Sequence, residues 1–228
     1  MKTDRRMLTV QIAGMALVFA LALFLAAGTA AWPAGWAFLV LFFGFTVALS
    51  VWLLRHSPGL LTERMTGIGK PDQKTWDKVF FGAANVIFLA WLITMPLDAV
   101  RFRWSHVPAW LQAVGALLML GSFYLFFLTF GENAYLSPAV RVQTEREQTV
   151  VSSGPYHYVR HPMYATAIIM LVGATLLLGS WIGLLPLAVL VVGIALRAVQ
   201  EERTLRAELP GYDAYMAQVK YRLIPHVW

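Results

Sequence analysis

The chain contains no cysteine, and charged residues make up only 13% of its 228 positions. The missing cysteines exclude disulfide bonds, thiolate metal sites and cysteine nucleophiles. The charged fraction lies far below the roughly 25% of soluble domains, whereas 59% of the residues are hydrophobic. These values predict a single membrane-embedded unit in contact with lipid. The net charge of +6 follows the loops between apolar segments, so we expect no nucleic-acid partner.

Six apolar segments approach the length of about 20 residues that crosses a bilayer. The last two are short and are joined by only Gly179 and Ser180, which predicts a tight helical hairpin. Five spans is the alternative if this hairpin does not fully cross. The predicted fold class is therefore all-α, a polytopic transmembrane helical bundle. The segments are 7–28, 33–54, 79–97, 108–130, 164–178 and 181–196.

Lysine and arginine are distributed unevenly between the two ends of these segments. All of the 18 except Arg101 and Arg103 fall on one face, from Lys2 at the start to Arg222 near the end. The positive-inside rule then predicts that both termini and the motifs described below are cytoplasmic. The first apolar run exceeds the 7–15 residues of a signal-peptide core, so we expect it to stay as a membrane anchor.

We divide the chain into two regions on this basis. Residues 1–130 form an N-terminal transmembrane region of four spans with a cytoplasmic loop at 55–78. Residues 131–228 form a C-terminal core with a polar loop, the helical hairpin and a C-terminal helix. The polar segment 131–162 is longer than a simple connection between two helices needs to be, and loops of this length are often functional.

A proline-stiffened turn, G-P-Y-H-Y-V-R-H-P-M-Y, begins at Gly154 and leads into the fifth segment. Pro162 favours the first turn of a helix, which places His161 near the N-cap. Such a terminus attracts anions, for example the carboxylate of a zwitterionic cofactor. An anchor at the depth of the lipid headgroups is the alternative. His157 precedes the helix, so the four-residue spacing of the histidines does not indicate a metal site.

A second motif, R-x-x-x-E-E, follows the sixth apolar run. Arg197 and Glu201 are four residues apart and share one helix face, whereas Glu202 points elsewhere. A weak surface ion pair is the alternative. Water is scarce after a long apolar run, and an arginine there suits a carboxylate or phosphate. A carboxylate suits a cationic cofactor or the hydroxyls of a ribose.

The order of these motifs resembles the isoprenylcysteine carboxyl methyltransferase family of integral-membrane enzymes. The resemblance also includes Y-x-x-Y and R-L-I-P near the end and covers about residues 132–225. It implies S-adenosylmethionine as cofactor, S-adenosylhomocysteine as product, and Arg197 as the substrate-binding arginine. Arg160, Glu202 and His157 are possible supporting residues. The implied cofactor-binding residues are Gln148, Thr149, Val150, Val151, Tyr156, His161, Pro162, Met163, Tyr164 and Glu201.

Two of these positions depart from the animal enzymes of the family. Gln148 stands where they carry a histidine, and Met163 stands where they carry a small serine. Contacts made by the backbone survive both changes, whereas contacts made by these two side chains do not carry over.

The resemblance implies methyl transfer to an amphiphilic acceptor that enters from the membrane. Carboxyl O-methylation of an isoprenylcysteine or similar prenylated acid is the most literal form. The related phospholipid methyltransferases share the C-terminal pattern, so N-methylation of a headgroup amine is the alternative. An amine must lose a proton, which would require a base such as His157 or Glu202. An NADPH-dependent enzyme like the sterol reductases, or a non-enzymatic membrane protein, would belong to other classes.

Overall fold

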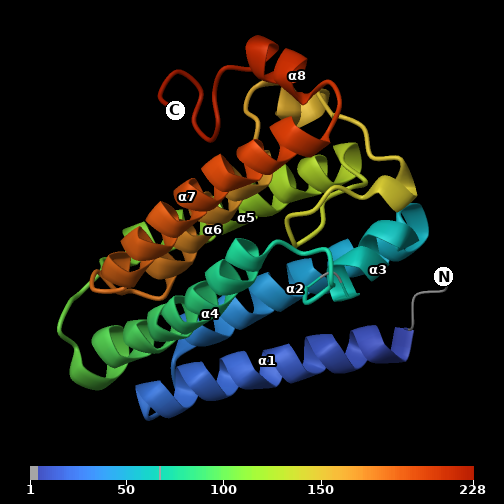
Figure 1. Cartoon of the computed structure of the whole chain (residues 1–228). Helices are drawn as coiled ribbons and strands as arrows, with labels where there is room; N and C mark the ends of the chain where they lie inside the picture. The colour runs from blue at the N-terminus through green and yellow to red at the C-terminus, as the bar shows by residue number, and fades with distance from the viewer. Residues whose placement is uncertain (1–4, 67) are drawn as a thin grey trace.

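The computed structural model describes residues 5–66 and 68–228, so Lys2 lies outside the described residues (Figure 1). The described residues are helical and contain no β-strand. The six long helices are α1 (Arg5–Ala27), α2 (Pro33–His56), α4 (Thr75–Pro96), α5 (Ala109–Glu132), α6 (Pro162–Leu177) and α7 (Leu184–Glu208). The shorter elements are α3 (Pro58–Thr66), the π-helical turn η1 (Leu97–Phe102), the 3₁₀ turns η2 (Thr144–Arg146) and η3 (Gly154–His157), and α8 (Tyr212–Gln218).

The predicted polytopic helical bundle is confirmed. Among the described residues, five helices are long and apolar enough to cross a membrane: α1, α2, α4 together with η1, α5 and α7. The sixth, α6, has 16 residues, or about 24 Å at 1.5 Å per residue. That is shorter than the roughly 30 Å of hydrocarbon in a bilayer.

The hairpin of α6 and α7 nevertheless runs the length of the bundle. Its turn lies against the connection between α4 and α5 at the far end. There Ser180 Oγ donates to Asp98 Oδ2 at 2.6 Å, and Trp181 Nε1 donates to the His106 carbonyl at 3.0 Å. The last apolar segment, predicted at 181–196, and the C-terminal helix predicted beyond it form one continuous helix, because α7 runs from Leu184 to Glu208. The charged residues that follow its apolar run pair with other parts of the chain.

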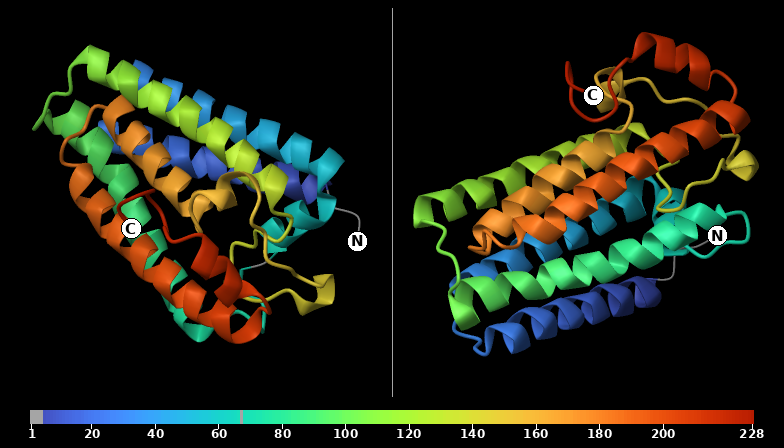
Figure 2. Two further views of the ribbon diagram at one scale, coloured as in Figure 1. Left: turned by 90° about the horizontal axis from the view of Figure 1, so that it is seen from above. Right: turned by 60° about the vertical axis from the view of Figure 1, so that its left-hand side comes forward.

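The two ends of the bundle differ in content. One end carries α3, the polar segment 133–161, α8 and the C-terminal segment, as Figures 1 and 2 show from three directions. The other end carries only the short connections 28–32, 103–108 and 178–183. Among the described residues, the basic residues predicted to be cytoplasmic gather at the first end. Their cytoplasmic orientation stays a prediction.

Helices α5 and α6 pack with their backbones in direct contact. A Cβ atom added to Gly115 would lie 2.6 Å from the Gly173 carbonyl oxygen, and one added to Gly173 would lie 2.7 Å from the Gly115 carbonyl oxygen. Small residues allow this close approach. In a membrane, helices associate through such van der Waals packing, because no hydrophobic effect drives them together. The rigid α5–α6 pair fixes the start of α6, where the proline-stiffened turn lies.

Candidate functional site

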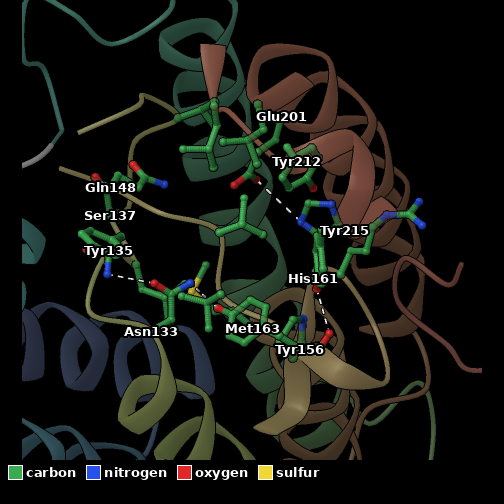
Figure 3. A pocket seen from close by; sticks show the side chains of 18 of the residues that line it. Asn133, Tyr135, Ser137, Gln148, Tyr156, His161, Met163, Glu201, Tyr212 and Tyr215 are labelled. Carbon is green, nitrogen blue, oxygen red and sulfur yellow. Dashed lines mark hydrogen bonds and ion pairs between the residues drawn. The ribbon is translucent and has the colours of Figure 1, made fainter. Parts of the chain in front are cut away.

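A pocket opens at the loop-rich end, between the 133–151 segment on one side and α6, α7 and α8 on the other (Figure 3). It is narrow, with a volume of about 90 Å³. The structure brings all ten predicted cofactor-binding residues into its lining, together with Arg160. The ten are Gln148, Thr149, Val150, Val151, Tyr156, His161, Pro162, Met163, Tyr164 and Glu201. Arg197, Glu202 and His157 are not among its lining residues.

His161 is the N-cap residue of α6, as predicted. Its backbone N–H donates to the Arg222 carbonyl at 2.9 Å, which ties the start of α6 to the C-terminal segment. Its ring stacks on Tyr164 with 5.4 Å between the ring centroids. The two ring nitrogens face two carboxylates: Nε2 lies 3.2 Å from Glu202 and Nδ1 lies 4.0 Å from Glu201. His161 therefore joins the pocket to the charged part of α7.

Glu202 is buried beneath the pocket and contacts three basic side chains. Arg160 Nε donates to its carboxylate at 2.6 Å and Arg222 Nε donates at 2.9 Å, in addition to the contact with His161. Arg160 also donates to the carbonyls of Val219 and Lys220 at 2.7 and 2.8 Å. This cluster fixes the C-terminal segment against the turn before α6. Glu202 thus acts as a structural counter-charge in this arrangement, with both oxygens occupied.

Glu201 points to the other side of the helix and into the pocket (Figure 3). Tyr164 donates its hydroxyl to Glu201 Oε2, which fixes the orientation of the carboxylate. Glu201 Oε1 accepts no hydrogen bond from the described part of the chain. One carboxylate oxygen is therefore available to a cationic or hydroxyl-bearing ligand.

Arg197 lies behind the pocket wall. Its ion-pair partner, Asp77, was not predicted. Its Nε donates to Asp77 Oδ1 at 2.9 Å and its Nη2 donates to the Pro138 carbonyl at 2.5 Å. Its guanidinium lies 5.4 Å from the ring centroid of Tyr164, which does line the pocket. Asp77 is completely buried and also accepts from the Val140 N–H at 2.9 Å. The sequence signal for Asp77 was weak: a single acidic residue in the first turn of α4.

A second ionic cluster supports the pocket wall formed by residues 133–151. This cluster was not predicted from the sequence. Arg141 lines the pocket and binds Glu63 of α3 through Nε and Nη2, both at 3.1 Å. It also binds Asp72 and Glu145, at 2.7 and 2.6 Å. Burial alone would raise the pKa of Glu63, but hydrogen bonds from Arg141, Lys70 and Ser137 lower it to about 2. The cluster connects the loop at 55–78 to the 133–151 wall.

Three tyrosines supply the aromatic part of the lining. Asn133 Nδ2 donates to the Tyr156 hydroxyl at 2.9 Å, and the Tyr215 hydroxyl donates to the Tyr156 carbonyl at 2.8 Å. Burial raises the pKa of Tyr156, Tyr212 and Tyr215, so these hydroxyls are neutral. The motif Y-x-x-Y was visible in the sequence, but only the fold shows that Tyr212 and Tyr215 reach the pocket.

His157 lies in η3, before α6, as predicted. It lines a different groove on the outer side of α5 and α6, of about 640 Å³ and mostly apolar. Glu132 lines the same groove, and Ser153 donates to its carboxylate at 2.6 Å. His157 is therefore separate from the candidate pocket, which shares only Pro162 with this groove.

Comparison with known proteins gives one family match. The model of the family described as phospholipid methyltransferase matches residues 110–209. The matched segment runs from α5 to the end of α7 and includes every predicted site residue. Among curated proteins, no match was found.

Proposed function

Because residues 110–209 belong to the phospholipid methyltransferase family, which indicates a membrane methyltransferase, we propose that this protein transfers a methyl group from S-adenosylmethionine to a lipophilic acceptor. One observation carries the proposal. One pocket at the polar end of the bundle is lined by all ten residues that the family resemblance implies as cofactor-binding. These residues come from the 148–151 segment, η3, α6 and α7, and they converge only in the fold.

The lining suits the parts of such a cofactor. Glu201 Oε1 is available for an ammonium group or ribose hydroxyls. The Met163 N–H has no acceptor in the described part of the chain, and at the N-terminus of α6 it suits a carboxylate. The buried rings of Tyr156, Tyr212 and Tyr215 offer flat surfaces for an adenine.

The pocket must widen to admit a ligand of this size. The 133–151 wall contains only one short 3₁₀ turn, whereas the opposite wall is helical. We expect this segment to move outward when the cofactor enters and to become protected from proteolysis once the cofactor is bound.

When bound, S-adenosylmethionine would supply an electrophilic methyl group on a sulfonium for transfer to the acceptor. The residues around the pocket orient the two reactants and exclude water. Correct positioning alone can lower a barrier by about 7–11 kcal/mol. A carboxylate acceptor is already ionised and needs no general base. Neither of the bases suggested for an amine acceptor, His157 or Glu202, lines the pocket, which favours an acid.

The acceptor class is tested by methyl transfer from radiolabelled S-adenosylmethionine in proteoliposomes. An isoprenylcysteine acid and a phospholipid with a primary amine headgroup would be offered separately. We expect label in the acid, released by mild base as an ester gives up methanol. Base-stable label in the amine lipid would instead support headgroup N-methylation, and no transfer to any acceptor would count against both.

A further inference from the structure

A second apolar groove lies within the bundle, between α1, α2, α3 and α5, and has a volume of about 450 Å³. We propose that this groove, which we call the Arg64 groove, binds the acceptor as an amphiphile with one apolar tail and an anionic headgroup. The inference rests on the proposed methyl transfer and names the acceptor's site. Its walls are apolar side chains such as Ile12, Phe45, Leu49, Phe126 and Met170.

Arg64 provides the polar end of the groove. Its Nη1 donates to the Leu136 carbonyl at 3.2 Å, and its guanidinium carbon lies 4.7 Å from the Phe130 ring centroid. Among the described residues it forms no ion pair, whereas Arg141, Arg160 and Arg197 each bind a carboxylate. Burial and the positive charge of Arg197 lower the pKa of Arg64 to about 10, so it stays charged at neutral pH.

A charged group without a counter-charge in an apolar site is costly. An anionic ligand would remove that cost, because a guanidinium binds carboxylate or phosphate oxygens in pairs. The groove outside α5 and α6 lacks this feature: its charged lining residue is Glu132. Of the two grooves, the Arg64 groove is therefore the one that complements an anionic headgroup.

The length of the Arg64 groove matches a membrane lipid tail. Its lining residues on α2 run from Phe42 to Leu53, which is about 16 Å at 1.5 Å per residue. This is close to half of the roughly 30 Å of bilayer hydrocarbon, the share of one leaflet. A tail in the groove would point from the polar end toward the bundle interior.

The polar end also adjoins the candidate cofactor pocket. The Leu136 residue that accepts from Arg64 lines that pocket. An anionic headgroup held by Arg64 would thus lie beside the methyl donor, which distinguishes an acceptor from a lipid bound elsewhere on the surface.

The site is tested first by equilibrium binding of radiolabelled palmitate to the full chain in nanodiscs of zwitterionic lipid, with hexadecylamine and hexadecanol as competitors. We expect Arg64→Gln to weaken palmitate binding at least tenfold, Arg64→Lys to weaken it less, and hexadecanol to compete equally in both. Leu49→Trp, which fills the groove, should reduce binding of all three. Arg55→Gln removes an exposed arginine near the same end and is the matched control, with binding unchanged. Equal palmitate affinity in wild type and Arg64→Gln would overturn the proposal.

A second pair of measurements separates this proposal from the proposed function. Arg64→Gln should keep its affinity for S-adenosylmethionine while the KM for the acidic acceptor rises about tenfold or more. An unchanged acceptor KM together with lost palmitate binding would mean a resident lipid and would overturn the acceptor assignment. Failure of the wild type to bind S-adenosylmethionine would reject the methyltransferase proposal, whereas the palmitate series would still report on the groove itself.

Discussion

The two halves of the chain contribute different kinds of residue to the same end of the bundle. The half that matches the family, 110–209, contains all the predicted site residues, and many are neighbours in sequence. The half before it contains the buried carboxylates Glu63 and Asp77 and the half-buried Arg64, which lie on α3 and α4. The C-terminal half forms the candidate pocket, whereas residues of the N-terminal half support its walls and supply most of the lining of the Arg64 groove.

The largest expected effect is on stability and lies within the C-terminal half. Glu202→Ala removes the carboxylate shared by Arg160, His161 and Arg222. Leaving buried charges without a partner costs about 3–5 kcal/mol, so thermal unfolding in detergent should occur at a much lower temperature. The matched control is Asp213→Ala, which breaks an exposed pair with Arg206 and should cost no more than about 1 kcal/mol. Similar shifts in both variants would contradict the structural role of Glu202.

The next effect is on cofactor binding. Glu201→Ala should reduce the affinity for S-adenosylmethionine by roughly 100-fold, because hydrogen bonds to a charged group contribute about 1.5–3 kcal/mol. Tyr164→Phe, which removes the donor that orients Glu201, should cause a smaller loss. Isothermal titration calorimetry measures both. Equal affinity in wild type and Glu201→Ala would reject this role for Glu201.

A third prediction concerns the contact between the halves. The double variant Asp77→Asn, Arg197→Gln removes both charges of a buried pair and avoids leaving either one alone. We expect the affinity for S-adenosylmethionine to stay within about threefold, since neither residue lines the pocket. Turnover should fall more than tenfold if Arg197 positions the acceptor, and single-turnover methyl transfer would measure it. Loss of cofactor affinity with normal turnover would reverse the assignment.

The smallest effect is a pH dependence that originates in the N-terminal half. The pKa of Glu63 is about 2 in the folded protein, against an ordinary value of 4.5. The unfolded chain therefore binds more protons between these values, and stability falls as the pH drops from about 4.5 toward 2. Glu63→Gln should flatten this part of a plot of unfolding temperature against pH. An unchanged slope in Glu63→Gln would assign the dependence to other carboxylates.

The sequence predicted those features that depend on contiguous residues. Apolar length gave the bundle, and Pro162 correctly placed His161 at a helix N-cap with His157 outside that helix. The last apolar segment and the helix predicted beyond it form one helix, α7, in which Arg197, Glu201 and Glu202 follow the apolar run. Their charges are offset by distant partners, including Asp77, which lies 120 positions from Arg197.

The roles of Glu63 and Arg64 were not predicted, because they too depend on residues far away in the sequence. Glu63 binds Arg141 across 78 positions, and nothing in the local pattern of α3 distinguishes its buried Glu63 from an exposed residue. Arg64 was counted only as one of many basic loop residues. That Arg64 has no carboxylate partner among residues 5–66 and 68–228 becomes visible only when the surrounding helices are in place.

The proposed function requires that the pocket bind a methyl donor. Calorimetric titration of the detergent-purified protein with S-adenosylmethionine, S-adenosylhomocysteine and NADPH tests it most directly. The account predicts micromolar binding of both adenosyl compounds and none of NADPH. Binding of NADPH alone would indicate a reductase, and binding of none of the three by a folded protein would contradict an enzymatic role for the pocket.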